Sequence, residues 1–158
     1  MKGKNKVAFF KVHPSFHPEQ IKDAVDGGYK AIVIEGYACG TLPAGGNIGE
    51  YDVCPAIEYA TSKRVPVFLI SGSQKHDNEG FALRIRYGSQ INAIKAGIIP
   101  LEIPTSNVFN IVISDLEKIV DEFEDFKVIE EKMIEKYCKP GYKERMTNTK
   151  NVLTETLV

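Results

Sequence analysis

Two histidines near the start of this sequence have a spacing that could support metal binding. His13 and His17 lie four positions apart, which on a helix would place both imidazoles on one face. Pro14 and Pro18 interrupt any continuous helix through this segment, and no third or fourth ligand accompanies the pair. We therefore expect surface or helix-capping histidines and no metal site.

A second group combines the residue types of a nucleophile, a base and an orienting acid. His76 and Asp77 follow Ser71 and Ser73 within a few positions. Residues this close together in one loop rarely reach the geometry of a catalytic triad, and no G-x-S-x-G turn accompanies them. A solvated loop is the favoured interpretation.

The segment 36–49, GYACGTLPAGGNIG, has the glycine content of a phosphate-binding loop. A nucleotide P-loop also requires a Lys-Ser/Thr pair after its last glycine, which is missing, and Pro43 interrupts the run. The dinucleotide pattern G-x-G-x-x-G is absent as well. We expect a long, flexible loop and no nucleotide or other cofactor.

The elements around these residues follow from the pattern of apolar runs. Continuous apolar segments predict strands at 6–12, 31–34 and 65–71, with a short fourth strand at 98–100. Helical spacing predicts helices after Pro18, over 51–62 and 89–95, and from Thr105 or Ser106 to Phe123. Alternation of strands and helices indicates an α/β fold, a three-layer Rossmann-like sandwich with a parallel sheet of about four strands.

The chain divides, on this interpretation, into an α/β domain at 1–125 and an extra segment at 126–158. Apolar residues continue at helical spacing from Phe126 to Tyr137, which predicts one further helix that could pack on a partner subunit. The sequence 138–141 breaks it. Residues 142–158 are mostly polar, and we expect a flexible tail or a strap that orders only on association.

In parallel sheets, ligands bind outside the carboxyl ends of the strands. Glu35 ends a predicted strand there, and its carboxylate could receive an ammonium or amide N–H, or could pin the glycine loop by accepting backbone N–H bonds. Both interpretations stay open. Ser73 and Gln74 follow the third strand and could hydrogen-bond to a small polar ligand or a neighbouring subunit. The predicted ligand-binding residues are Glu35, Tyr37, Thr41, Ser73 and Gln74.

Composition limits the functions that this chain could have. The 158 residues are 43% hydrophobic and 26% charged, with a formal net charge of -1. This balance gives no electrostatic case for direct binding to nucleic acid or to an anionic membrane. No apolar run approaches the ~20 residues that cross a bilayer. Cysteines at 39, 54 and 138 are scattered, so we expect reduced thiols and a cytoplasmic protein.

Several sequence segments together resemble one known family. They are IVIEGYACGTLP (32–43), VPVFLISGSQ (65–74), RYGSQINAIKAGII (86–99) and PTS (104–106). In this order they resemble the C-terminal domain of L-asparaginases, particularly the cytoplasmic type and the D subunit of archaeal glutamyl-tRNA(Gln) amidotransferase. The resemblance extends from about residue 6 to residue 123 and implies the fold of that domain.

The resemblance also implies where catalysis would reside. In that family the nucleophile is a threonine in an N-terminal T-G-G-T loop, helped by an H-G-T-D-T segment, and neither motif occurs in this chain. We therefore assign no catalytic residue. Ser15 matches an asparagine of secreted asparaginases that reaches a neighbouring active site. Glu35 and Lys75 match an arginine and a cysteine of the bacterial effector site, so that site is not expected in its bacterial form.

Three functional hypotheses remain open. The leading one is a C-terminal-like domain without its catalytic half, acting as scaffold and dimerisation module of an asparaginase or amidotransferase-type amidohydrolase. It implies a homodimer and a possible separate N-terminal catalytic chain. The alternative is a sensor that binds an amino acid or amide. The third is a different enzyme on the same scaffold, using His13, His17 or His76; whether the chain is an enzyme therefore stays open.

Overall fold

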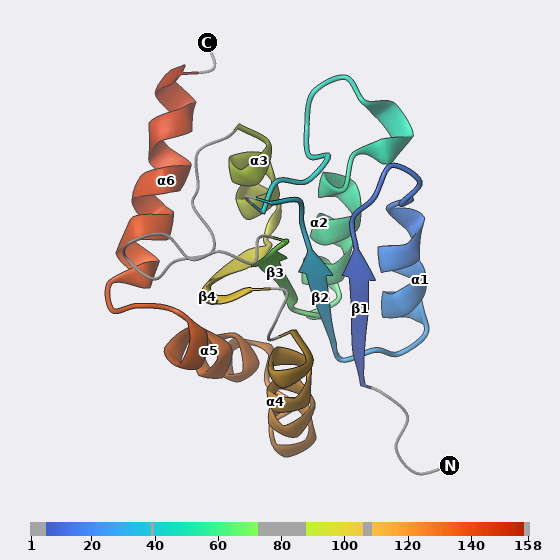
Figure 1. Ribbon diagram of the computed structural model, residues 1–158, viewed down its shortest axis with the longest axis vertical. Coiled ribbons are helices and arrows are strands. Elements are labelled where there is room, and N and C mark those ends of the chain that lie inside the picture. Colours follow the sequence, from blue (N-terminus) through green and yellow to red (C-terminus); the bar gives the residue numbers. More distant parts are fainter. Residues whose placement is uncertain (1–5, 39, 73–87, 106–108, 157–158) are drawn as a thin grey trace.

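The computed structural model describes residues 6–38, 40–72, 88–105 and 109–156, and its centre is a four-stranded parallel sheet (Figure 1). The strands pair in the order β1-β2-β3-β4. This arrangement confirms the predicted α/β fold with a parallel sheet. The strands are β1 (Val7–Lys11), β2 (Ala31–Glu35), β3 (Val67–Ser71) and β4 (Ile99–Thr105).

Burial separates the inner strands from the edge strands. Every residue of β2 and β3 is buried, as expected of apolar strands that are covered on both faces. In β1, burial decreases toward Lys11, which is exposed. β4 is longer than the predicted 98–100 and ends at Thr105, so the predicted start of the next helix at Thr105 is wrong; residues 106–108 lie outside the described residues.

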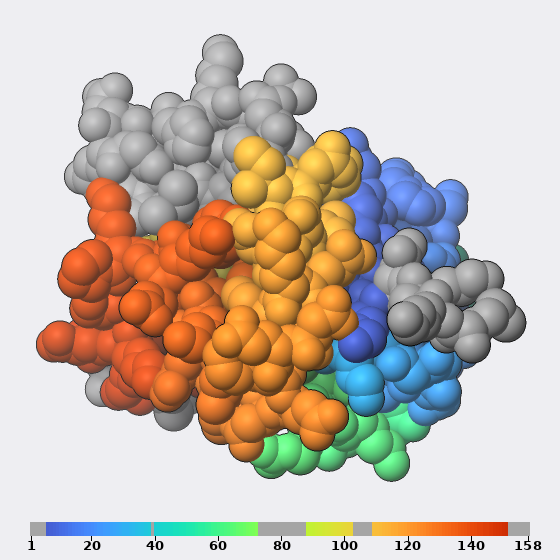
Figure 2. Space-filling view, turned by 90° about the horizontal axis from the view of Figure 1, so that it is seen from below, coloured from blue at the N-terminus to red at the C-terminus, as the bar shows by residue number. Residues whose placement is uncertain are grey.

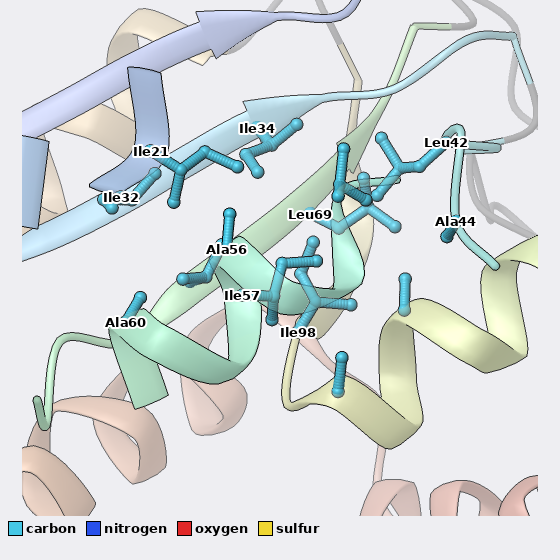
Figure 3. Packing of buried hydrophobic residues seen from close by; sticks show 14 of the residues in the cluster. Ile21, Ile32, Ile34, Leu42, Ala44, Ala56, Ile57, Ala60, Leu69 and Ile98 are labelled. Carbon is cyan, nitrogen blue, oxygen red and sulfur yellow. The ribbon is translucent and has the colours of Figure 1, made fainter. Parts of the chain in front are cut away.

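Three helices cover one face of the sheet because each connects two adjacent strands with the same hand of crossover. Their apolar sides join β2 and β3 in one buried cluster. Figure 3 shows Ile57 of α2 below Ile34 of β2, with Ile98 close by. The helices are α1 (Glu19–Asp26), α2 (Cys54–Ser62) and α3 (Gly88–Ala96), and a short 3₁₀ turn, η1 (Gly49–Tyr51), precedes α2.

Two helices, α4 (Phe109–Glu122) and α5 (Phe126–Tyr137), form the second buried cluster with the opposite face of the sheet. The Asp125 side chain caps α5 by accepting hydrogen bonds from the N–H groups of Lys127 and Val128. The predicted further helix after Phe126 is therefore confirmed. Its apolar stripe packs against β4 and α4 of its own chain.

The expected flexible tail at 142–158 is wrong for α6 (Tyr142–Thr156), which is helical and packs against α3. The Tyr142 hydroxyl donates to the carbonyl oxygen of Pro100 at 2.8 Å. Arg145 Nη2 lies 2.6 Å from Glu102 Oε1, and Glu102 is buried. These contacts connect a polar helix to an edge strand that is far away in sequence. The predicted domain boundary at residue 125 stays a prediction.

Within the described ranges, none of these helices combines the length and apolarity required to span a bilayer.

Replacing Arg145 with alanine should weaken the attachment of α6. Glu102 would keep the hydrogen bond from the Lys139 N–H and lose its cationic partner. We expect the free energy of unfolding to fall by about 1–2 kcal/mol, a range reduced from that of a fully buried pair because Arg145 is partly exposed. Urea denaturation measures this change.

Lys143→Ala is the matched control, since Lys143 pairs with Glu131 on the exposed surface. Its effect should stay within about 0.5 kcal/mol. Equal effects of the two substitutions would show that the pair between Arg145 and Glu102 does not hold α6.

Candidate functional site

The carboxyl ends of the parallel strands lie at one edge of the sheet, toward which the arrowheads of β1 and β2 point at the top of Figure 1. The strands end in residues with polar side chains. Ligands of open parallel sheets bind outside this edge. The end residues are Lys11, Glu35, Ser71 and Thr105.

Glu35 is buried at the end of β2, beside Lys11 at the end of β1. Lys11 Nζ lies 3.7 Å from Glu35 Oε1, and the side chains are 69% and 5% exposed, respectively. This separation makes an ion pair but exceeds the range of a hydrogen bond. No hydrogen bond to the Glu35 carboxylate occurs within the described part of the chain. Its oxygens therefore keep the capacity to accept an N–H group.

Tyr37 and Thr41, two other predicted site residues, face each other across a tight turn. The Tyr37 N–H donates to the Thr41 carbonyl oxygen at 3.0 Å, and the Gly40 N–H donates to the Tyr37 carbonyl oxygen at 2.7 Å. A Cβ on Gly36 would lie 2.9 Å from the Thr41 oxygen, so only glycine fits there without a shift. The turn leaves the Tyr37 side chain exposed and Thr41 half-buried.

The loop after β3 approaches this turn closely. The Gly72 N–H donates to the Tyr37 carbonyl oxygen at 3.2 Å, and the buried Ser71 hydroxyl donates to the Ala38 carbonyl oxygen at 2.6 Å. The structure therefore unites Glu35, Tyr37 and Thr41 at one edge. The other two predicted residues, Ser73 and Gln74, lie outside the described residues, as do His76 and Asp77.

The glycine loop was predicted to be flexible, but Asp52 and Asn92 anchor it. Asp52 Oδ1 accepts hydrogen bonds from the N–H groups of Gly45 at 2.9 Å and Cys54 at 3.0 Å. Asn92 Nδ2 donates to the Ala44 carbonyl oxygen at 3.2 Å. Burial acts to raise the pKa of Asp52, but hydrogen bonds from the N–H groups of Gly45 and Cys54 and from the Cys54 side chain together lower the pKa.

Neither described N-terminal histidine assembles a catalytic or metal-binding group. Nδ1 of His13 accepts from the Ser15 N–H, and Nδ1 of His17 accepts from the Glu19 N–H at the start of α1. His13 is exposed and His17 is partly exposed, which agrees with the expected surface position, while the N-cap residue of α1 is Pro18. His17 Nε2 lies 3.9 Å from a Glu50 oxygen, beyond hydrogen-bond reach. No cluster of three metal-ligating side chains occurs among the residues that the structure describes.

In the part of the chain that the structure describes, no basic side chain hydrogen-bonds to the Thr41 hydroxyl. Cys54 and Cys138 are free thiols, and burial raises the pKa of each to about 12, so both stay protonated at neutral pH. The described residues of the edge can accept and donate hydrogen bonds, and among them the Thr41 hydroxyl has no base beside it.

Sequence reasoning missed three residues of this edge that hold it together. Asp52 stands two positions before Cys54-Pro55, a pattern typical of a helix start, and this signal could have identified it. Lys11 lies within the predicted strand 6–12, but its place beside Glu35 depends on the register of β1 on β2, which only the structure shows. Asn92 carries no local signal, because its partner Ala44 is 48 positions away.

Comparison with known proteins places this sheet in a described family. A family model for the glutaminase/asparaginase C-terminal domain matches residues 6–103. The chain is 36% identical over 101 residues to the glutamyl-tRNA(Gln) amidotransferase D subunit of Thermococcus kodakarensis, and 36% identical over 104 residues to that of Pyrococcus abyssi. Each match covers 64% of this chain and 20% of the relative, so the chain spans about one fifth of their length.

Solved structures support the same fold. L-asparaginase I from Vibrio cholerae has a TM-score of 0.61 at 15% identity, covering 82% of this chain and 36% of that one. The thermostable L-asparaginase from Thermococcus kodakarensis has a TM-score of 0.59 at 21% identity, covering 80% and 35%.

Removing the Asp52 carboxylate should release the glycine loop from the start of α2. We expect Asp52→Ala to lower the free energy of unfolding by about 1 kcal/mol at neutral pH. The folded-state pKa is lowered from 3.8, so this stability is full above the unfolded-state pKa and is lost as pH falls through the folded-state pKa. Urea denaturation of both proteins at neutral pH and at about pH 3 measures it.

The difference in the free energy of unfolding between wild type and Asp52→Ala should become smaller in acid. Asp52→Asn, which keeps an oxygen acceptor without the charge, is the control and should show a smaller loss with little pH dependence. An equal loss at both pH values would contradict the assigned role of the charge.

Adding a methyl group at Gly72 should disturb the contact between the two loops. A Cβ there would lie 2.5 Å from the Gly36 carbonyl oxygen, and this backbone oxygen cannot move without shifting its loop. Gly72→Ala should cost about 1–3 kcal/mol in thermal unfolding. Gly88→Ala is the control, because nothing lies within 4 Å of its added Cβ. An unchanged melting temperature for Gly72→Ala would refute the close approach.

Proposed function

This chain belongs to the glutaminase/asparaginase C-terminal domain family, and from that premise we propose that it is the supporting domain of an amidohydrolase or amidotransferase. In this proposal it cuts no amide bond itself. It docks against a separate chain that carries the catalytic threonines and helps to complete that chain's substrate pocket.

One observation carries the proposal. The family model covers β1, β2, β3 and most of β4, residues 6–103, while the 158 residues contain neither T-G-G-T nor H-G-T-D-T. A threonine hydroxyl requires a positioned base to attack an amide, and the described part of the carboxyl edge offers none. The matched relatives are named as an amidotransferase subunit, which supports a role beside other chains.

The carboxyl edge supplies the surface for this partner. Tyr37, Ile48 and Tyr51 are large side chains that are 43%, 39% and 47% exposed, and all belong to the loop between β2 and α2. Aromatic side chains contribute strongly to protein interfaces. Glu35, next to this loop, would accept an N–H group from the partner or from an amide substrate.

Other parts of the proposal concern assembly and compartment. We infer a homodimer, with a cytoplasmic location in which the free thiols of Cys54 and Cys138 stay reduced. Neither the matched family nor the matched relatives are described as sensors, so the sensor alternative has no support from the comparisons.

The purified chain alone should release no ammonia from asparagine or glutamine above the buffer blank. Mixing it with a chain that carries T-G-G-T and H-G-T-D-T should give a complex in size-exclusion chromatography and restore ammonia release. Coupled detection of ammonia measures both. Release by the chain alone, abolished by substituting one of its own residues, would overturn the proposal.

Two substitutions separate docking from catalysis. Tyr37→Ala should weaken the complex about tenfold or more, as expected when an interfacial aromatic residue is truncated. Glu35→Gln keeps the shape of the side chain and should lower activity of the assembled complex with less effect on its formation. Lys22→Gln on α1, whose lysine pairs with Glu19, serves as the surface control.

A further inference from the structure

A cleft of about 660 Å³ opens at the amino edge of the sheet, opposite the candidate site. Its wall comes from the start of β1, the turn between α1 and β2, the end of α2 and the region between α4 and α5. Figure 2 views this face, where blue, light blue, green and orange segments of the chain meet. The volume falls within the range of pockets that hold small-molecule ligands.

Two of the acidic side chains in this cleft already have partners within the protein. Asp26 Oδ1 accepts a hydrogen bond from the Tyr59 hydroxyl at 2.6 Å. Asp121 Oδ1 lies 2.5 Å from Lys6 Nζ. Glu124 is the remaining carboxylate of the lining. The Lys6–Asp121 pair removes one charge of each sign, and the Asp26 carboxylate keeps its charge because its partner hydroxyl is neutral. The lining therefore has four cationic side chains and three carboxylates, which leaves a net positive charge.

Three cations of the same cleft, Lys30, Lys63 and Arg64, form no ion pair within the described residues. All three are exposed. Lys63 Nζ lies 5.6 Å from the centroid of the Tyr59 ring, and the Arg64 guanidinium lies 5.5 Å from that of Phe126. These ring contacts orient the two side chains, which form no ion pair with a carboxylate of the described residues.

Arg64 also occupies an unusual backbone conformation. Its φ is 60°, and among the described residues it is the only one other than glycine with a positive φ. It follows the C-cap of α2, where the Arg64 N–H donates to Thr61 and the Val65 N–H donates to Ala60, each at 2.9 Å. Glycine is favoured at this left-handed position. A long cationic side chain there points to a use for its guanidinium group.

We propose that the amino-edge cleft binds a small organic phosphate, with Lys30, Lys63 and Arg64 as its ligands. Three cations that line one cleft attract a phosphate dianion, and the planar guanidinium can donate two parallel hydrogen bonds to its oxygens. The cleft exceeds the size of a phosphate group alone. Tyr29 and Tyr59 in its lining provide surface for the organic part.

Calorimetric titration of the full chain tests this site with four probes: inorganic phosphate, adenosine monophosphate, glucose 6-phosphate and citrate. At least one organic phosphate should bind with a millimolar or lower Kd, more tightly than citrate. Backbone amide signals of Lys30, Lys63 and Arg64 should shift in nuclear magnetic resonance spectra of the same titration.

Arg64→Gly separates binding from folding. Glycine suits the backbone at this position, so the melting temperature without ligand should stay unchanged or rise, while affinity for the organic phosphate falls about tenfold or more. Lys143→Gln removes the same charge on α6 and should leave affinity unchanged.

Three results would overturn the proposal: no binding of any phosphate probe at millimolar concentration, equal affinity for citrate, or unchanged affinity in Arg64→Gly. The cleft lies at the edge opposite the proposed docking surface. A negative result for the phosphate proposal would therefore leave the amidohydrolase proposal intact. A negative result for the amidohydrolase proposal would likewise leave the phosphate proposal intact.

Discussion

The carboxyl ends of β2 and β3 approach each other so closely that no side chain fits between the backbones that follow them. A Cβ on Gly72 would lie 2.5 Å from the Gly36 carbonyl oxygen, and the Gly72 N–H bonds to the carbonyl oxygen of Tyr37. The Ser71 hydroxyl adds a bond to Ala38. Because backbone groups make most of these contacts, the loop that carries Tyr37 is held in place within the chain itself, and docking of the proposed partner would carry a lower ordering cost.

The ion pair at this edge depends on whether water reaches it. Glu35 is buried, whereas Lys11 is mostly in solvent, so water and salt screen the attraction between them. A protein surface placed over the edge would exclude water from Lys11 and strengthen the attraction. It would also bring N–H donors to oxygens that accept no hydrogen bond from the described residues. A buried acid at the rim is therefore better suited to an assembly than to an isolated domain.

The parts of the fold that the sequence predicted are those with local signals. The runs in β2 and β3 are apolar at every position but the last, so burial on both faces followed directly. α6 was missed because its contacts are long-range: Tyr142 bonds to Pro100 and Arg145 pairs with Glu102, while most of the helix is polar. The residues of the candidate site also divide into those with a local sequence signal and those that depend on long-range contacts. Glu35 follows from its place at a strand end, but Asn92 depends on a distant carbonyl group.

Helix dipoles explain part of the charge distribution between the two edges of the sheet. The crossover helices run opposite to the strands, so their positive amino ends lie near the carboxyl edge and their negative carboxyl ends lie near the amino edge. The positive charge of Lys63, the C-cap residue of α2, interacts favourably with the negative end of this helix dipole. The dipole alone does not account for Arg64, because a glycine at the next position would end the helix with less backbone strain and leave Lys63 in place. The contact between the Arg64 guanidinium and the Phe126 ring stabilises this second cation within the chain itself. An anion held in the adjacent cleft, as proposed, would add to that stabilisation.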